Sequence, residues 1–475
     1  MSVIGELASF VCGAKASALP ESEQQRLRLH LTDTVVAALA GACIPEGEAL
    51  GTCADAGALA DRIGRRAAAA RLTEIDDIHL PSCTTPSAGA VPVALALAAS
   101  TQNFDPDELA SAIWAGVEIT TRIGLAVDGA KILYRGIWPT YLAAPVAAAA
   151  TAARMLGLDV ERASHALSLA LMLAAGGVGR IGGAPSGRWF LYAKAVAGGV
   201  AAAQAARAGC RGDPELLDKE WLADTHGIAL DRARLTEGLP QKSVYSSLSL
   251  KPFCSAKQAI AAVEAFRGIV GAANIGIEEK TQAIQEIQKN QKIEHIKKIQ
   301  VRVPSAYAGM IGRRAEPGER QSTMVSVAHQ IALAAIAPQR LYDVDRSMPV
   351  ADGQDMKHVM EHVVQLAAKV EVAADSALDA FYPQHWPAEV EVDVSGQTFR
   401  RRVVAAEGDP EHPLGRSAID DKAHRVLDPL IGAERVDDWL TMCHGALDGS
   451  SECRRLVAAF AQAANVDSAP LAAKQ

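Results

Sequence analysis

Segments rich in alanine, leucine and valine, with the period of an α-helix, run through the first half of the chain. The clearest extends from Ser22 to Ala42 and stops at the step from Ile44 to Pro45, as expected where a helix ends. Asp159 stands where a capping residue is needed. Helix surfaces made of alanine and glycine let helix axes approach closely, which predicts one large helical domain. The other segments cover residues 91–100, 107–127, 139–156, 160–176 and 188–208.

The character of the sequence changes after residue 260. The alternating run KIQVRVP predicts a strand that ends at Pro304, and AEVEVDVSGQTFRRRVV predicts a hairpin with a Ser-Gly turn. Helical patterns lie near 324–337 and 355–369, and helical periodicity returns from Ser417 onward. The predicted fold class is therefore mostly α, with a large all-helical domain and a smaller α+β domain. The helical domain takes residues 1–260 and is completed by 406–475, and the α+β domain takes 261–405.

Charge and composition exclude several classes of function. The 47 basic and 55 acidic residues give a formal net charge of -8 that is spread along the chain, whereas nucleic-acid binding needs a concentrated basic face. No stretch reaches the roughly 18 apolar residues of a membrane helix, and the N-terminus lacks the features of a secretory signal. The eight cysteines show no C-x-x-C pair and no metal-ligand spacing. We expect a cytoplasmic protein with no nucleic-acid or membrane partner.

The densest cluster of ionisable residues is ARLTEIDDIHLPSCTTPSAG. Glu74, Asp76, Asp77 and His79 lie here within six positions, between two apolar segments. Carboxylates at the edge of a packed interior have shifted pKa values that suit acid–base catalysis, although a solvated acidic turn explains the pattern equally well. Oxygen and imidazole donors also suit a divalent ion. No second His or Cys cluster stands at a usable spacing, so we do not expect a metal site.

A glycine-rich segment, AAGGVGRIGGAPSGRW, formally matches the dinucleotide-binding pattern through Gly177, Gly179 and Gly182. That pattern requires a preceding strand, and the residues before it predict a helix, so we do not favour nucleotide binding. Arg180 and Arg188 flank the segment, and guanidinium groups beside exposed amides suit a carboxylate ligand. An ordinary loop between helices is the alternative.

A third segment, SLSLKPFCSAKQAIAAVEA, places Lys251 and Lys257 around Cys254 near the predicted domain boundary. Pockets are common at such boundaries, and a buried lysine can act as a base or hold a carboxylate. Surface lysines before a helix are the simpler interpretation. Because Cys254 has no histidine nearby in the sequence, we do not favour a thiol nucleophile.

Three segments, in this order, resemble the MmgE/PrpD family, whose members include 2-methylcitrate dehydratase, cis-aconitate decarboxylase and iminodisuccinate epimerase. They are TEIDDIHLPSCTTPSAGAVPVALALA, GIWPTYLAAPVAAAATAARMLGL and LKPFCSAKQAIAAVEA, and the resemblance extends from Leu7 to about Ala337. It implies a large helical domain, a smaller α+β domain inserted before the chain returns to the first, and an active site between them.

The resemblance also matches individual residues of this chain to elements of the family. The family's acidic element matches Glu74, Asp76 and Asp77, and the lysine of its Lys-Pro-aromatic element matches Lys251. Arg188 stands where the family has a lysine; it keeps the charge but does not release a proton near neutral pH.

Two family histidines are replaced, by Thr85 and by Trp138. A dehydratase needs an acid at the leaving hydroxyl, so this change disfavours the standard 2-methylcitrate dehydratase mechanism. His79 and His329, the latter near a family tyrosine, are the candidate replacements. An epimerase needs no such acid, so the altered set of site residues suits an epimerase at least as well.

We therefore expect a cofactor-free enzyme that abstracts a proton next to a carboxylate of a small di- or tricarboxylate, as a lyase, dehydratase or epimerase. The alternatives are a non-catalytic polycarboxylate-binding or scaffold protein and a nicotinamide-dependent oxidoreductase. The alanine-rich surface and the resemblance lead us to expect a homodimer. The candidate catalytic residues are Asp76, Asp77, His79, Lys251 and His329, and the candidate substrate-binding residues are Glu74, Thr85, Trp138, Arg188 and Lys257.

Overall fold

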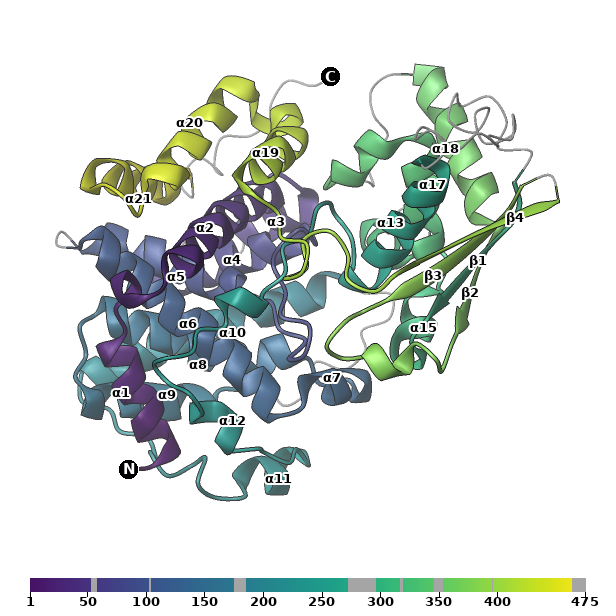
Figure 1. Ribbon diagram of the computed structural model, residues 1–475. Coiled ribbons are helices and arrows are strands. Elements are labelled where there is room, and N and C mark those ends of the chain that lie inside the picture. Colours follow the sequence, from purple (N-terminus) through teal and green to yellow (C-terminus); the bar gives the residue numbers. More distant parts are fainter. Residues whose placement is uncertain are drawn as a thin grey trace. The chain divides into compact units, whose positions relative to one another are not determined.

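The chain forms two compact units, which we call unit 1 and unit 2. Unit 1 contains Met1–Leu250 and Gly415–Gln475, and unit 2 contains Lys251–Leu414. In Figure 1, unit 1 carries the purple-to-blue helices and the yellow C-terminal helices, and unit 2 carries the sheet. The predicted class, mostly α with a smaller α+β part, is confirmed. The computed structural model describes residues 1–52, 58–101, 104–174, 185–271, 296–316, 319–345, 353–394 and 396–463.

The helices of unit 1 begin and end close to the predicted limits, and the predicted cap is confirmed, since the Asp159 side chain accepts a hydrogen bond from the Arg162 N–H. The main helices are α1 (Val3–Gly13), α2 (Glu21–Ala42), α3 (Pro45–Thr52), α4 (Leu59–Leu72), α5 (Ser87–Ser100), α6 (Pro106–Ala126), α7 (Gly129–Ile132), α8 (Pro139–Met155), α9 (Val160–Met172), α10 (Pro185–Arg207), α11 (Trp221–His226), α12 (Ala233–Thr236), α19 (Arg416–Ile431), α20 (Ala433–Gly445) and α21 (Ser450–Ala463). In the described part of the chain, no single helix is long and apolar enough to cross a membrane; α2 and α3 pass that test only together, across a bend of 86°.

Helix α8 lies at the centre of unit 1, where it packs against α5, α6, α9 and α10. Its residues from Pro139 to Ala153 are all buried. The contact with α10 depends on Gly199, because a Cβ atom there would lie 2.0 Å from the backbone oxygen of Pro145. The alanine-rich sequence thus acts through close helix contacts, as predicted.

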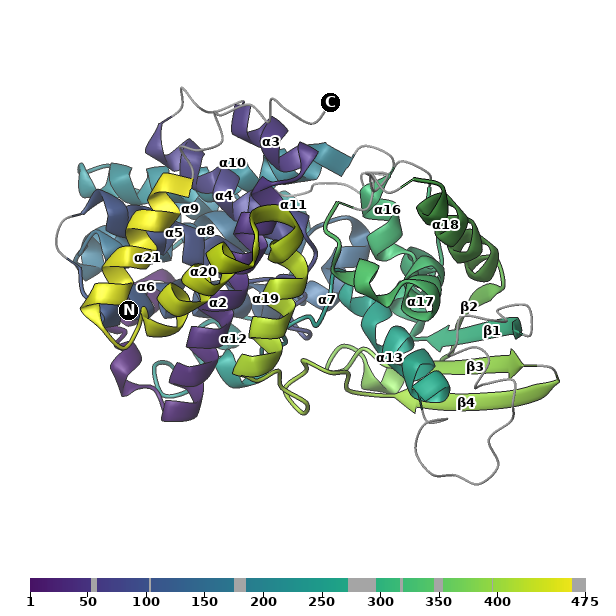
Figure 2. The same cartoon turned by 90° about the horizontal axis from the view of Figure 1, so that it is seen from above.

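The C-terminal helices return to unit 1 and complete it. Helix α19 packs on α2, and α21 packs on α5, as both views in Figures 1 and 2 show. At the first of these contacts, Lys422 of α19 forms a buried ion pair with Asp33 of α2. The Lys422 ammonium also donates a hydrogen bond to the Ile75 carbonyl oxygen, at 3.4 Å. Burial raises the pKa of Asp33, and Lys422 acts in the opposite direction.

Unit 2 combines a four-stranded sheet with helices. The strand order is β2-β1-β3-β4, with β1 parallel to β2 and the other pairs antiparallel. Helix α13 packs on β3 and β4, and α17 packs on α13 and α18. The elements are α13 (Lys257–Gly271), β1 (Ile296–Val303), α15 (Ser305–Ile311), α16 (Arg320–Val325), α17 (Val327–Ile336), α18 (Gly353–Ala367), β2 (Val370–Ala374), β3 (Ala388–Val394) and β4 (Gln397–Val403).

The predicted strand before Pro304 and the predicted hairpin are confirmed as β1 and as β3 with β4. Strand β2 was not predicted. It has only five residues, follows α18 almost directly and lies at the edge of the sheet, so its sequence carries no extended alternating pattern. Its place is set by pairing with β1, a contact between distant parts of the chain.

Removing one partner of the Asp33–Lys422 pair should destabilise the protein strongly. Lys422→Met leaves a buried carboxylate without its counter-charge, and we expect a loss of about 3–5 kcal/mol in the free energy of unfolding. The double variant with Asp33→Leu should recover most of this loss, because it removes the unpaired charge as well. Urea unfolding measures both.

The matched control is Arg425→Met on the same helix, since Arg425 forms an exposed ion pair with Asp421. It should cost at most about 1 kcal/mol. Equal losses in Lys422→Met and Arg425→Met would contradict the importance given to the buried pair.

Candidate active site

The segment between α4 and α5, residues 73–86, carries the predicted ionisable cluster, and we call it the acidic loop. Its residues are buried except for half-buried Pro81. Glu74 is 9% exposed, Asp76 is fully buried and Asp77 is 1% exposed. A solvated acidic turn is therefore excluded, and each carboxylate must be stabilised by protein groups.

The conformation of the acidic loop is fixed by its neighbours. Glu74 and Cys83 both adopt positive φ, 54° and 52°, which is unusual for residues other than glycine and is retained only where the surroundings enforce it. The loop backbone pairs with itself through His79 and Thr84. Helix α7 approaches so closely that a Cβ atom on Gly129 would lie 1.9 Å from the Ser82 carbonyl oxygen. The loop is thus held in one arrangement.

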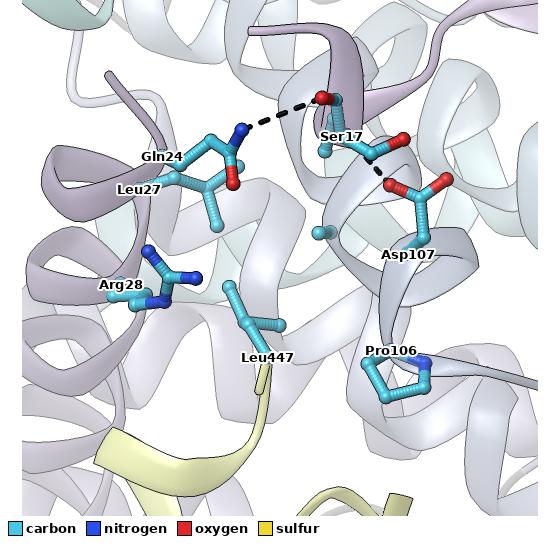
Figure 3. Close-up of a pocket in the computed structure, with 9 residues that line it drawn as sticks. Ser17, Gln24, Leu27, Arg28, Pro106, Asp107 and Leu447 are labelled. Atoms are coloured by element: carbon cyan, nitrogen blue, oxygen red, sulfur yellow. Dashed lines mark hydrogen bonds between the residues drawn. The ribbon is translucent and has the colours of Figure 1, made fainter. Parts of the chain in front are cut away.

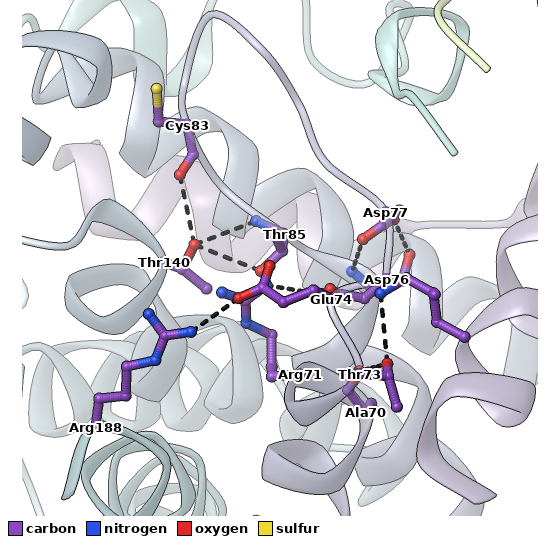
Figure 4. Close-up of polar contacts among 12 residues, drawn as sticks. Ala70, Arg71, Thr73, Glu74, Asp76, Asp77, Cys83, Thr85, Thr140 and Arg188 are labelled. Atoms are coloured by element: carbon purple, nitrogen blue, oxygen red, sulfur yellow. Dashed lines mark hydrogen bonds and ion pairs between the residues drawn. The ribbon is translucent and has the colours of Figure 1, made fainter. Parts of the chain in front are cut away.

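Two aspartates of the loop are neutralised within unit 1. Asp76 pairs with Arg71, the penultimate residue of α4. Burial acts to lower the pKa of Arg71, but the nearby carboxylates, Asp76 first, outweigh it and raise that pKa. Asp77 accepts hydrogen bonds from the Ser87 hydroxyl at 2.5 Å and the Ser87 N–H at 3.2 Å, and lies 2.9 Å from Nδ1 of His30. Figure 4 shows Asp77 and Arg188 at opposite ends of this group of side chains.

Glu74 binds the predicted arginine of α10. Its Oε1 lies 2.8 Å from Nη2 of Arg188, and both side chains are nearly buried, 11% and 12% exposed. The Arg188 guanidinium carbon lies 3.9 Å from the ring centre of Trp189 and 5.0 Å from that of Trp138. These cation–π contacts hold the guanidinium in place, and Figure 4 shows it extending toward Glu74.

Thr85 and Trp138, the two positions at which the resemblance implies histidine, lie beside this ion pair. Thr85 donates its backbone N–H to the Thr140 hydroxyl at 3.2 Å, and Thr140 contacts the Cys83 carbonyl oxygen at 3.5 Å. Trp138 precedes α8 and stacks on Tyr141, with ring centres 5.6 Å apart and an interplanar angle of 15°. Neither residue offers an imidazole, so neither is suited to proton transfer near neutral pH.

His79 is buried inside the acidic loop and is neutral. Burial lowers its pKa from the ordinary 6.5 to about 4, with Asp77 acting weakly in the opposite direction. Nδ1 accepts the Ser82 N–H at 3.3 Å and lies 2.9 Å from the Ser82 hydroxyl, which continues to Thr84 at 2.6 Å. With Nδ1 accepting, Nε2 carries the proton, and His79 is a donor rather than a base.

Three predicted residues belong to unit 2. Lys251 is its first residue and is buried. Lys257 forms an ion pair with Asp409 at 2.6 Å, and both side chains are 2% exposed. His329 lies in the first turn of α17, where its backbone N–H donates to the capping Ser326 hydroxyl at 3.4 Å. The other seven predicted residues lie in unit 1, on the acidic loop, before α8 and on α10.

Sequence reasoning missed three buried residues around this cluster: Arg71, Tyr141 and Tyr192. Arg71 resembles any polar residue near the end of a helix, and the tyrosines lie within alanine-rich helices whose pattern predicts only packing. The ring centres of Tyr141 and Tyr192 lie 5.2 Å apart. The one available signal was the low aromatic content of the chain, 4%, which makes aromatic residues beside a predicted site informative.

Two other features do not add to the site. The glycine segment with Gly177, Gly179, Arg180 and Gly182 lies outside the described residues. Within the described part of the chain, no group of three or more His, Cys, Asp or Glu side chains is arranged to hold a metal ion.

Unit 1 also has a small hollow of about 120 Å³ (Figure 3), away from the acidic loop. Several of its polar groups are already paired: the Ser17 N–H donates to Asp107 at 2.7 Å, and Gln24 donates to the Ser17 and Leu19 carbonyl oxygens. Its volume is below the roughly 300–1,000 Å³ of ordinary ligand pockets. We therefore assign it no function. The lining residues are Ala16, Ser17, Gln24, Leu27, Arg28, Pro106, Asp107, Ala110 and Leu447.

Comparison with family models places the chain in a class of dehydratase- and lyase-type enzymes. Residues 65–226 match the MmgE/PrpD N-terminal domain, and residues 272–444 match the MmgE/PrpD C-terminal domain. The chain belongs to the MmgE/PrpD family. The first match includes the acidic loop, and the second extends into α19 and α20 of unit 1. A search of curated proteins finds no match.

Gly129→Ala should disturb the acidic loop directly. The added Cβ collides with the Ser82 carbonyl oxygen, so we expect a loss of about 1–3 kcal/mol in unfolding free energy and a displaced loop. Gly13→Ala, where a Cβ meets no described atom within 4 Å, is the control and should be neutral or stabilising. Urea unfolding compares the two, and equal effects would contradict the close contact.

His79 should make stability depend on pH in a defined window. The folded protein holds His79 neutral down to about pH 4, whereas the unfolded chain takes up a proton near pH 6.5. Stability is therefore lost as pH falls through this window, by up to about 3 kcal/mol from this residue. His79→Asn keeps an acceptor for the Ser82 N–H and does not titrate, so this part of the decline should disappear.

Urea unfolding at several pH values between about 7 and 4 measures the effect. His358→Asn, at a side chain 71% exposed, should leave the pH profile unchanged. A decline of the same size in the wild type and in His79→Asn would show that His79 is not held neutral.

Proposed function

We propose that this protein is a cofactor-free enzyme that removes a proton next to a carboxylate of a small di- or tricarboxylate, as a lyase, dehydratase or epimerase. The observation that carries the proposal is the buried Glu74–Arg188 ion pair between two indole rings. A guanidinium fixed in this way suits recognition of a carboxylate, which it can bind through two parallel hydrogen bonds. Family membership supports the reaction class.

In this proposal, Arg188 stabilises the negative charge that develops when the α-proton leaves. Enolate formation places charge on the substrate carboxylate oxygens, and a fixed cation lowers the energy of that state. Glu74 is paired with Arg188, so the substrate carboxylate exchanges with or joins Glu74. The resemblance assigns a second cation, Lys251, to the same task, and we retain it in the proposal.

Most of the remaining groups lie on the acidic loop. Asp76 is paired with Arg71, and Asp77 is bound by Ser87 and lies beside His30; carboxylates held in this way are candidate bases. His79 is neutral and carries its proton on Nε2, so its role in the proposal is to donate. His329 is the second candidate donor. Glu74 and Thr85 position the substrate, whereas Lys257 is already paired with Asp409.

A second candidate, a polycarboxylate-binding protein without catalysis, is favoured by one observation. Trp138 stands where the family has histidine, stacks on Tyr141 and lies against Arg188. An indole at this position contributes packing rather than proton transfer. The two candidates share a ligand class and differ in turnover.

We also propose that the protein acts as a homodimer.

The test is incubation in heavy water with citrate, 2-methylcitrate, aconitate and iminodisuccinate isomers, followed by NMR. We expect deuterium uptake at the α-carbon or a new product with at least one of them. Arg188→Gln should lower the rate by about 100-fold, because it removes one charge-stabilising group. Arg207→Gln, in the exposed last turn of α10, is the control and should leave the rate unchanged.

The outcomes separate the alternatives. Neither uptake nor product with any of these compounds, with thermal stabilisation by one of them, supports the binding protein. The absence of both chemistry and stabilisation contradicts the proposal. Stabilisation by NAD would favour the oxidoreductase alternative.

A further inference from the structure

Tyr141 is the third residue of α8 and is buried, with 1% of its surface exposed. Its hydroxyl has no hydrogen-bond partner in the part of the chain that the structure describes. Buried polar groups are nearly always hydrogen-bonded, because leaving one unpaired costs its lost hydration. A helix this well packed would accept phenylalanine at this position without that cost. The hydroxyl therefore requires an explanation outside packing.

The surroundings of Tyr141 are those of the candidate site. Its ring stacks on Trp138 and lies 5.2 Å from that of Tyr192. Two further buried donors nearby, Nε of Arg188 and Nε1 of Trp189, also have no acceptor among the described residues. The Arg188 guanidinium carbon lies 3.9 Å from the Trp189 ring centre, which links these donors in one cluster. Three buried donors of this cluster thus have no acceptor among the described residues, although carboxylates lie nearby.

The protonation state of Tyr141 fits a donor. Burial raises the pKa of its hydroxyl, and Arg188 and Arg71 offset this only in part. The hydroxyl therefore keeps its proton at neutral pH and can donate a hydrogen bond.

We propose that Tyr141 is a catalytic residue that contacts the substrate, donating its hydroxyl hydrogen bond to a carboxylate oxygen that becomes the enolate oxygen. This inference rests on the proposed function and adds to it a residue that replaces the missing imidazole as a neutral donor. Arg188 supplies positive charge. Tyr141 supplies a short and directional hydrogen bond to one oxygen atom. No proton is transferred from Tyr141 in this role.

The test compares Tyr141→Phe with Tyr307→Phe, which removes a buried hydroxyl that donates to the Pro387 carbonyl oxygen at 3.0 Å. Without ligand, Tyr141→Phe should be at least as stable to urea as the wild type, whereas Tyr307→Phe should be less stable. With substrate, Tyr141→Phe should lower the deuterium-exchange or product rate by about 100-fold, mainly in kcat, and Tyr307→Phe should not. The unreactive probe tricarballylate should raise the melting temperature of the wild type more than that of Tyr141→Phe.

Each outcome decides a separate point. Reduced stability of Tyr141→Phe without ligand would show an internal partner for the hydroxyl and overturn the inference. Wild-type rates and stabilisation in Tyr141→Phe would also overturn it while leaving the proposed function intact. If the wild type itself shows no reaction and no stabilisation by any carboxylate, the proposed function fails, and the role of Tyr141 fails with it.

Discussion

Burial of several carboxylates in one small volume is the constraint on which unit 1 depends. A buried charge is tolerated only when an opposite charge or hydrogen-bond donors replace the lost water. Asp76 is matched by Arg71, Glu74 by Arg188 and Asp33 by Lys422. The partners come from α4, α10 and α19, so neutralising the carboxylates also connects helices that are far apart in the sequence. The same contacts that make the acidic loop possible therefore make it rigid.

This rigidity bears on the chemistry we propose. Enzymes stabilise developing charge most effectively when the stabilising groups are already in place. Three features hold side chains of the site in fixed positions. They are the strained backbone at Glu74, the close approach of Gly129 and the two indoles around Arg188. Such features are unusual around a loop that only joins two helices.

Much of the fold followed from local sequence patterns. The helical period gave the helices of unit 1 to within a few residues, and alternation gave β1 and the hairpin, because both signals lie within short stretches of chain. Strand β2 was not predicted, because its five residues are ordered by pairing with β1. For the site, the cluster of ionisable residues in the sequence predicted the position of the acidic loop. Arg71 and Tyr141 could not be predicted in the same way, because their burial, and the lack of an acceptor for the Tyr141 hydroxyl among the described residues, are properties of the packed structure.

The return of the chain to unit 1 has a consequence for biosynthesis. Helix α19 supplies Lys422 to Asp33 and to the Ile75 carbonyl oxygen, but it is made only after all of unit 2. While the ribosome is still adding residues 251–414, the emerging helices of unit 1 already contain Asp33 and lack its cation. The contacts of Lys422 with Asp33 and with the acidic loop therefore form only after α19 has been made, and the chain of unit 1 that precedes unit 2 cannot complete the described arrangement by itself.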